Sequence, residues 1–393
     1  MSASDKSVLV LSHLFPSPAR PGLGSFVADS VRELARRHAI RVISPVRWVP
    51  PLRSAWREER RVQSERDEDG FLVSYPRVLA LPFGGLPTET RLWPASLERI
   101  VRRICAEHDV GLVHAHFGLP DGWAGLRLAR RVGLPIVVTL WGSDALVFPR
   151  ERPSRKLLAE VVSGADHVIA ASNEIASRAA DMGASADRLS VIVGGVPSAY
   201  GEGTRAGARR ALDVSEHGPL VVWVGGLVPV KRPALALAAF AEVVERLPDA
   251  QLTMIGDGPL RATVERQTDA LGLRSHTRLT GHLGRASVAL WQRAANTVMN
   301  SSVSEGTPFG LMESLVCGTR VAAVPVGGIP DLVALTDGGT LAANADSATA
   351  LADAILTELL RPPDPGLADR ARQLTVNVTS DSISAIYAGL ASV

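Results

Sequence analysis

The chain has 393 residues, of which 46% are apolar and 21% are charged. This composition is typical of a globular protein with room for two or three domains, and it excludes disordered and fibrous chains. The formal charge of only +2 also argues against a nucleic-acid binder driven by bulk charge. The two cysteines, Cys105 and Cys317, lie far apart without a CxxC pair, which argues against a disulfide framework or a Cys-based zinc site.

Charge is distributed unevenly along the chain. The first 193 residues hold 26 Lys and Arg against 21 Asp and Glu, and the remainder holds 16 against 19. No apolar stretch approaches the roughly 18 residues that cross a bilayer, and the opening residues lack the pattern of a signal peptide. We therefore expect a cytoplasmic protein whose basic N-terminal half either carries solvated arginines or docks peripherally on the inner face of the cell membrane.

In the first half, short β-branched runs alternate with longer Ala-, Leu- and Arg-rich stretches at helical spacing. This alternation predicts a parallel sheet covered by helices. The expected strands are residues 7–12, 40–44, 71–75, 110–114, 136–139, 168–171 and 189–193. The expected helices are residues 25–37, 96–107, 123–131, 155–163 and 173–181.

The alternation pauses at residues 194–219, a stretch rich in Gly, Ser and Arg, which we interpret as an interdomain linker. It restarts with expected strands at 220–224, 251–255, 277–279, 297–300 and 320–323. The expected helices are 233–246, 260–271, 287–293, 309–316 and 347–359. We predict an α/β fold of two Rossmann-like lobes, 1–193 and 220–375, which face a central cleft. A C-terminal helix within 376–393 is expected to pack back on the first lobe.

The segment from Glu305 to Glu313 carries the clearest chemical signal. Thr307 suits a helix N-cap and Pro308 the first helical position, so unpaired N–H groups and the positive end of the helix dipole favour an anion there. Gly310 allows a diphosphate to approach these amides closely. The two carboxylates are roughly 7 Å apart along the helix axis, on either side of such a diphosphate. When two glutamates occur at this spacing without further motifs, the first more often only interacts with the helix dipole, and the second is more often a solvated helical residue.

The surrounding sequence changes that interpretation, because its motifs resemble those of family 4 glycosyltransferases with the two-lobed GT-B fold. In the second half these motifs are 224–231, 255–260, 280–283 and 302–331. In the first half they are the glycine-rich loop 21–27 and the segment 114–122, which resembles members that build bacterial surface polysaccharides. The resemblance extends over nearly the whole chain.

This resemblance implies a retaining hexosyltransferase that uses a nucleoside diphosphate sugar as co-substrate and neither a metal nor a cofactor. Glu313 would bind the ribose hydroxyls of the donor, Glu305 would contact the transferred sugar, and Lys231 would neutralise the departing diphosphate. Further donor contacts are implied for Phe309, Gly310, Leu311, Arg232, Gly24, His282 and Leu283. The acceptor would be a glycan, a lipid-linked sugar or a small molecule.

Two positions depart from the family pattern. Gly226 stands where the family usually has Arg, so Lys231 is the cation in register, with Arg232 beside it. Trp141 stands where members often have His, three residues before Asp144. Trp141 is then either a wall or stacking platform for a sugar, or a core tryptophan at a strand end.

The acceptor cleft is expected to include Trp141, Asp144 and His116. His114 and His116 follow each other on one strand, and we expect them to point to opposite faces and so not to share a metal. A membrane-docking surface is a further hypothesis, based on basic and aromatic residues of the first half. These residues are Arg32, Arg36, Arg37, Arg99, Arg102, Arg103, Trp48 and Trp56.

Other functions have less support in the sequence. A serine hydrolase would need a G-x-S-x-G elbow after a strand, and an NAD enzyme would need a complete dinucleotide fingerprint. A nucleotide-sugar epimerase or phosphorylase on the same fold remains an alternative, because fold does not fix chemistry. The missing Arg and His leave a second alternative, a catalytically silent nucleotide-sugar-binding partner.

Overall fold

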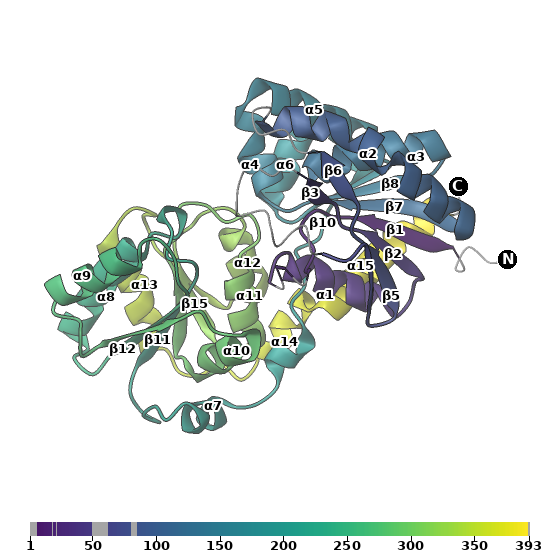
Figure 1. The fold of residues 1–393 in the computed structure, drawn as a ribbon. Coiled ribbons are helices and arrows are strands. Elements are labelled where there is room, and N and C mark those ends of the chain that lie inside the picture. Colours follow the sequence, from purple (N-terminus) through teal and green to yellow (C-terminus); the bar gives the residue numbers. More distant parts are fainter. Residues whose placement is uncertain (1–5, 18, 21, 49–61, 80–84, 392–393) are drawn as a thin grey trace. The chain divides into compact units, whose positions relative to one another are not determined.

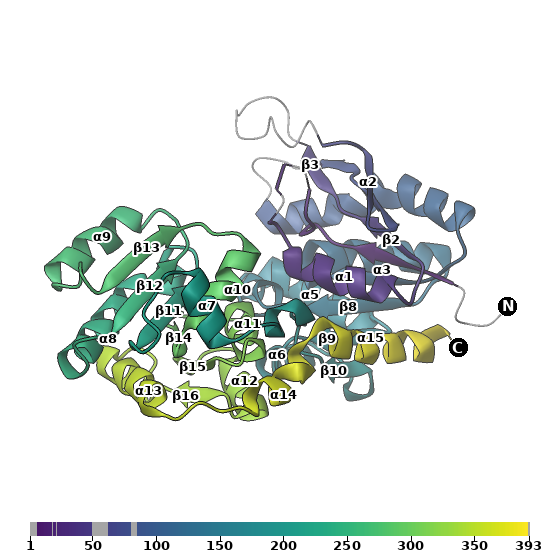
Figure 2. The same cartoon turned by 90° about the horizontal axis from the view of Figure 1, so that it is seen from below.

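The computed structural model describes residues 6–17, 19–20, 22–48, 62–79 and 85–391. The chain divides into two compact units, one made of Met1–Gly195 with Val376–Val393 and the other of Val196–Thr375 (Figures 1 and 2). The stretch interpreted as a linker therefore belongs almost entirely to the second unit. It forms a short helical turn, Ser198–Gly201, and helix α7 (Arg205–Ala211), because Tyr200 and Ala208 are buried there and anchor it.

The first unit contains an eight-stranded sheet with the order β10-β9-β8-β7-β1-β2-β5-β4, in which only β4 pairs antiparallel to its neighbour. Its strands are β1 (Ser7–Leu11), β2 (Ile40–Ile43), β4 (Glu65–Glu68), β5 (Phe71–Ser74), β7 (Val110–His116), β8 (Ile136–Leu140), β9 (His167–Ala170) and β10 (Leu189–Val191). A separate parallel pair is formed by β3 (Val46–Trp48) and β6 (Arg77–Leu79). Every residue of β8 is buried, as its continuous apolar run predicts for a parallel strand covered on both faces.

The helices of the first unit include the C-terminal helix of the chain. They are α1 (Ser25–Ala35), α2 (Gly85–Glu107), α3 (Trp123–Val132), α4 (Ser143–Leu146), α5 (Arg152–Gly164), α6 (Asn173–Asp181) and α15 (Val376–Ala391). The yellow α15 lies beside α1 in both views (Figures 1 and 2). Two side-chain hydrogen bonds fix it, one between the His38 ring and the Ser384 hydroxyl at 2.8 Å and one between the His114 ring and the Tyr387 hydroxyl at 2.5 Å.

The second unit has a fully parallel six-stranded sheet with the order β13-β12-β11-β14-β15-β16, which is the Rossmann order. Its strands are β11 (Leu220–Val224), β12 (Gln251–Ile255), β13 (Thr277–Gly281), β14 (Thr297–Asn300), β15 (Arg320–Ala323) and β16 (Gly339–Leu341). Its other helices are α8 (Pro233–Arg246), α9 (Arg261–Ala270), α10 (Arg285–Ala294), α11 (Phe309–Val316), α12 (Ile329–Thr336), α13 (Ala348–Leu360) and α14 (Leu367–Ala371). Helices α8, α9 and α13 cover one face and α10 and α11 the other (Figure 1), which leaves the loops at the carboxyl ends of the strands to carry polar side chains.

Candidate active site

A buried carboxylate and a lysine meet in the second unit. Glu305 lies in the loop between β14 and α11, and Lys231 ends a short turn after β11. The Lys231 Nζ is 2.6 Å from Glu305 Oε1, and the same oxygen accepts hydrogen bonds from Ser302 Oγ at 2.6 Å and Asn300 Nδ2 at 3.0 Å. Glu305 is only 8% exposed. Oε2 receives no hydrogen bond from any residue that the structure describes, so this oxygen is available to a ligand hydroxyl.

The backbone of Glu305 is held as tightly as its side chain. Gly327 has a φ of +58°, and a Cβ at this position would lie 1.6 Å from the Glu305 carbonyl oxygen. The N–H of Gly328 donates to that oxygen at 3.2 Å. The turn at 327–328 therefore requires glycine and fixes the direction in which the Glu305 side chain leaves the loop.

The N-terminus of α11 differs in one respect from the expectation. Pro308, rather than Thr307, occupies the cap position, because its φ and ψ of −81° and 65° are not helical. Its carbonyl accepts the N–H groups of Leu311 and Met312. The Gly310 N–H has no acceptor within the described chain, and a Cβ on Gly310 would have no heavy atom within 4 Å. The anion site at this helix end therefore centres on Gly310.

Of the two neighbours implied as donor contacts, Leu311 is less accessible than Gly310 and Phe309 is intermediate, as Gly310 is. Leu311 is 3% exposed and its N–H is already bonded, so the structure gives it a core position instead of a donor contact. Phe309 is half-buried, and its N–H donates to Thr307 at 2.9 Å. The apolar spacing that makes α11 amphipathic explains why these side chains turn inward.

Glu313 lies one turn into α11, next to two residues that the sequence did not indicate. The Tyr200 hydroxyl hydrogen-bonds with both Glu313 and Arg285, and burial together with the Glu313 charge raises the pKa of Tyr200. The Arg285 guanidinium lies 6.0 Å from the centre of the Tyr200 ring. These contacts orient a half-buried carboxylate beside a hydroxyl and a cation, a set that suits vicinal hydroxyls. The sequence signal that could have indicated Tyr200 is a single tyrosine in a stretch rich in Gly and Ser.

Arg232 is committed to the backbone and does not present a free guanidinium to a ligand. Its Nε donates to Ser301 O at 2.6 Å, and Nη2 donates to Ser302 O at 3.0 Å and to Ala345 O at 2.7 Å. Its Nη1 bonds Asp346 at 2.5 Å. In the structure Arg232 holds the loop that carries Ser302 to Glu305, and its implied donor contact stays a prediction.

The other donor contacts implied in the second unit remain predictions. His282 is exposed and Leu283 half-buried at the end of β13, and neither bonds Glu305 or Glu313 in the described part of the chain. A Cβ at Gly226 would meet its nearest heavy atom, Asp257 O, at 3.8 Å, which is ordinary contact. A residue with a Cβ therefore fits at this position without a close contact.

In the first unit, the residues expected to line an acceptor cleft are buried. His116 is 1% exposed and Trp141 8%, and the Trp141 Nε1 lies 3.3 Å from His116 Nδ1. Burial lowers the pKa of His116 to about 3, so the ring is neutral. The expectation that His114 and His116 point to opposite faces is wrong. Their rings stack with centroids 4.3 Å apart, because residues two apart on a strand share a face.

Asp144 and Gly24 also have structural roles in the first unit. Asp144 is fully buried, and its carboxylate accepts backbone N–H groups of Gly118 and Gly142 at 2.9 Å each. Burial raises the pKa of Asp144, and these hydrogen bonds partly offset the rise. At Gly24 the φ is +66°, and a Cβ would lie 2.0 Å from Leu14 O. The structure thus assigns Asp144 to loop organisation and Gly24 to close backbone packing before α1.

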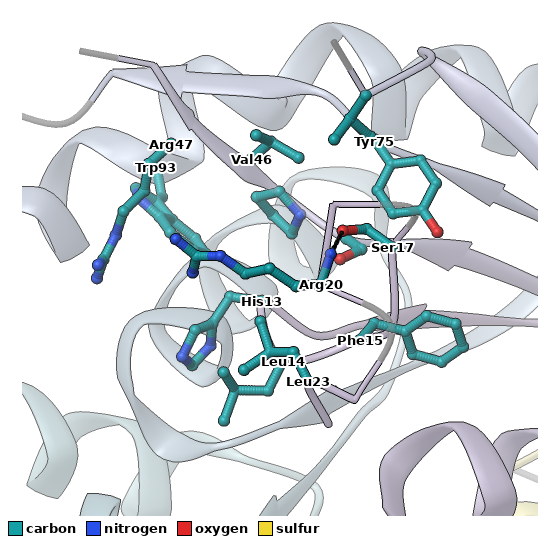
Figure 3. Close-up of a pocket in the computed structure, with 13 residues that line it drawn as sticks. His13, Leu14, Phe15, Ser17, Arg20, Leu23, Val46, Arg47, Tyr75 and Trp93 are labelled. Atoms are coloured by element: carbon teal, nitrogen blue, oxygen red, sulfur yellow. Dashed lines mark hydrogen bonds between the residues drawn. The ribbon is translucent and has the colours of Figure 1, made fainter. Parts of the chain in front are cut away.

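A pocket in the first unit lies at the carboxyl ends of β1, β2 and β5 and has a cavity volume of about 170 Å³. Figure 3 shows His13, Arg47 and Trp93 toward one end of this view and Phe15 and Tyr75 toward the other. Burial raises the pKa of Tyr75 to about 12, and its hydroxyl donates to Pro16 O at 2.8 Å. This volume is below the roughly 300–1,000 Å³ of drug-sized ligand sites, so the pocket would hold a small ligand.

Matches to protein families follow the division of the chain. Residues 21–200 match the family described as Glycosyltransferase Family 4, and residues 205–373 match Glycosyl transferases group 1. A D-inositol 3-phosphate glycosyltransferase from Frankia alni is 33% identical over 69% of this chain and 71% of its own length. The chain belongs to the family 4 glycosyltransferases. A putative teichuronic acid biosynthesis glycosyltransferase, TuaC from Bacillus subtilis, is 28% identical over 88% of each chain.

Solved structures agree on the fold of this glycosyltransferase. Sucrose-phosphate synthase from Thermosynechococcus elongatus superimposes with a TM-score of 0.78 at 18% identity, over 98% of this chain and 99% of its own. Anabaena Alr3699/HepE, solved in complex with UDP, gives 0.73 at 17% identity over 98% and 100%. The predicted GT-B fold with two Rossmann-like lobes is confirmed.

The arginines on which the membrane-docking hypothesis rests are mostly neutralised in this glycosyltransferase. Ion pairs join Arg32 to Asp29, Glu68 and Asp69, Arg36 to Glu33, Arg37 to Asp381, Arg102 to Glu98 and Arg103 to Glu65. Trp48 is 43% exposed, and Trp56 lies outside the described residues. These ion pairs weaken the basis of the hypothesis, and membrane docking stays a prediction.

Two features are absent from the described residues, a membrane-spanning helix and a metal-binding cluster. No helix there is both long and apolar enough to cross a membrane. No group of three or more His, Cys, Asp and Glu side chains within the same residues is placed to hold a metal ion.

Proposed function

We propose that this glycosyltransferase transfers a hexose-type sugar, with retention, from a nucleoside diphosphate sugar bound to the second unit. Glu313 with Tyr200 and Arg285 binds the ribose hydroxyls, and the Gly310 amide with Lys231 takes the diphosphate. Glu305 Oε2 contacts a hydroxyl of the transferred sugar. The Anabaena neighbour was solved in complex with UDP, which supports a nucleoside diphosphate sugar as donor.

In this proposal the bond between the anomeric carbon and the diphosphate breaks, and the electron pair stays on the phosphate oxygen. The acceptor hydroxyl attacks from the same face, and its proton passes to that oxygen. The Lys231 ammonium and the Gly310 amide stabilise the developing negative charge, so no separate protein base is needed. Because Nζ carries three protons, Lys231 can keep its contact with Glu305 while it bonds a phosphate.

The observation that carries the proposal is the Lys231–Glu305 contact at 2.6 Å between residues 74 positions apart. It places a cation for the leaving group directly beside a carboxylate with one unbonded oxygen. A silent binding protein would have no need for this arrangement, and an epimerase or phosphorylase is disfavoured by the family of this chain.

Names of the relatives support a polyol or glycan as acceptor. One relative is a D-inositol 3-phosphate glycosyltransferase and another is a putative teichuronic acid enzyme. We propose a hydroxyl-rich acceptor of this kind in cytoplasmic polysaccharide or glycoconjugate biosynthesis. Membrane docking is not part of the proposal, because most of the arginines in question are paired.

The test is a panel of UDP-, GDP- and ADP-hexoses screened by thermal shift, followed by assay of sugar release and of transfer to inositol 3-phosphate and simple glycans. A donor at 100 times its dissociation constant stabilises the protein by roughly 2.7 kcal/mol, which such a screen detects. The proposal predicts sugar release from at least one donor, undiminished by EDTA. Nucleotide binding without release of sugar would instead establish a silent binding protein.

A further inference from the structure

A histidine–aspartate pair lies at the pocket of the first unit, outside every residue assigned above to the donor. Asp121 is fully buried, and its Oδ1 accepts the backbone N–H of His13 at 2.7 Å. The other carboxylate oxygen, Oδ2, contacts the Nδ1 of the His13 ring. One carboxylate therefore holds both the backbone and the ring of His13, across 108 positions of sequence.

The neighbours of His13 fix the plane of its ring. Trp93 and Phe117 approach the ring edge-on, with centroids 6.1 and 5.3 Å away. The His13 side chain is 21% exposed and lines the pocket shown in Figure 3. A ring that is clamped on one side and open to a cavity on the other is positioned to meet a ligand.

The Asp121 contact also determines what His13 presents to the pocket. Burial raises the pKa of Asp121, and the charge and hydrogen bonds of His13 oppose that rise. In the neutral ring, a carboxylate bonded to Nδ1 places the single proton on that nitrogen and leaves the lone pair on Nε2. Nε2 has no hydrogen-bond partner in the part of the chain that the structure describes, and a hydroxyl is the group that it would bind.

Other polar groups at the pocket indicate the same ligand chemistry. Trp93 is fully buried, and its Nε1–H has no acceptor within the described chain. The charge of Arg47 is compensated by Glu89 at 2.6 Å. Because the charge of Arg47 is already compensated within the protein, the hydrogen-bonding groups at this pocket favour a neutral, hydroxyl-rich ring over a bare anion.

We propose that this pocket binds the polyhydroxylated acceptor, with His13 Nε2 accepting a hydrogen bond from one acceptor hydroxyl and Asp121 holding the ring in that tautomer. His13 is then a residue that binds and positions the acceptor. The inference rests on the proposed glycosyl transfer, whose proton still passes to the departing diphosphate.

A matched pair of variants separates the two nitrogens of His13. In His13→Asn the amide nitrogen takes the place of Nδ1 and keeps the Asp121 contact, but nothing replaces Nε2. In His13→Gln the amide lies near the position of Nε2 and the Asp121 contact is lost. A purely structural histidine would therefore be replaced best by Asn, and an acceptor-binding histidine by Gln.

Binding is measured by saturation-transfer NMR with myo-inositol, inositol 3-phosphate, glucose, mannose and N-acetylglucosamine as probes. We expect at least one probe to bind the wild type. The same probe should bind His13→Asn about tenfold more weakly, which is the effect of losing one good hydrogen bond, and should bind His13→Gln within about threefold of the wild type. Melting temperatures should show the reverse order, with His13→Gln the less stable variant. Absence of binding by every probe, or binding to His13→Asn equal to the wild type, overturns the inference.

Sugar release from the donor without acceptor is recorded for the same proteins. The proposed donor residues all lie in the second unit, so sugar release by each variant reports on the donor site and is compared with probe binding by the same variant. A wild type that binds a probe but releases no sugar from any donor contradicts the proposed function and not the acceptor site. Asp121→Asn provides a second check, because an amide donating to Nδ1 moves the ring proton to Nε2, which a nitrogen-15 spectrum of the ring detects.

Discussion

Replacement of Lys231 by Met tests the cation on which the proposed chemistry depends. The substitution keeps most of the side-chain volume and removes the ammonium that lies 2.6 Å from Glu305 Oε1. Glu305 keeps its hydrogen bonds to Ser302 and Asn300, so the carboxylate is not left without partners. The variant should therefore fold, and its defect should be mainly kinetic.

The expected magnitudes follow from these contacts. A charge-assisted hydrogen bond contributes about 1.5–3 kcal/mol, and the 29% exposure of the Lys231 side chain reduces this to about 1 kcal/mol of folding stability. Loss of one preorganised group that stabilises a developing anion costs about 3 kcal/mol in the transition state, a factor of about 10² in kcat. The rate effect should therefore greatly exceed the stability effect.

Arg232→Met is the matched control, because the adjacent cation is bonded to three carbonyl oxygens and one carboxylate. Its removal leaves buried carbonyl groups unpaired, at a cost of about 1–3 kcal/mol. Steady-state kinetics with the best donor and thermal unfolding are measured for both variants. Lys231→Met should lose rate and Arg232→Met should lose stability. A loss of less than about threefold in kcat for Lys231→Met would refute its role at the leaving group.

Three further predictions concern the donor site. Glu313→Gln should raise the donor KM by about tenfold with little change in kcat, whereas Glu305→Gln should lower kcat by about 10², because only the second contact strengthens at the reacting carbon. Wild-type kinetics in both variants would reject the site. Tyr200→Phe removes the hydroxyl bonded to Glu313 and Arg285 and should raise the donor KM by about threefold to tenfold, and an unchanged KM would remove Tyr200 from the ribose site. Gly226→Arg restores the cation usual in the family at a position where a Cβ fits without a close contact and should raise kcat by roughly threefold to tenfold, and a decrease would show that this loop uses another geometry.

The parts of the fold that the sequence predicted well are the buried parallel strands and the helices between them. The ranges expected for β11, β12, β14 and β15 coincide with the observed bounds, as do those of α6, α8 and α11. Each of these strands is a β-branched or apolar run next to a turn. A strand buried on both faces needs apolar residues at nearly every position, so its sequence is easy to recognise. The short strands β3, β4, β6 and β16 were missed, because each has three or four residues and at most one buried side chain.

The site was predictable only where a local motif defines it. The E-x7-E spacing located Glu305, Glu313 and the start of α11 within one residue. The partners of these residues come from distant segments, such as Lys231 for Glu305 and Tyr200 for Glu313. No local period encodes such pairings, because they depend on which strand ends become neighbours in the sheet. The same reason accounts for the His13–Asp121 pair, which no motif in the sequence indicated.

The anomeric configuration of the first sugar released by this glycosyltransferase tests the central claim most directly. Proton NMR of the enzyme with an α-linked nucleoside diphosphate hexose, recorded before the free sugar mutarotates, needs no knowledge of the acceptor. Retention at the Glu305–Lys231 site predicts that the α-anomer appears first and that any transferred product is α-linked. A β-anomer or β-linked product at the earliest time points would contradict the account.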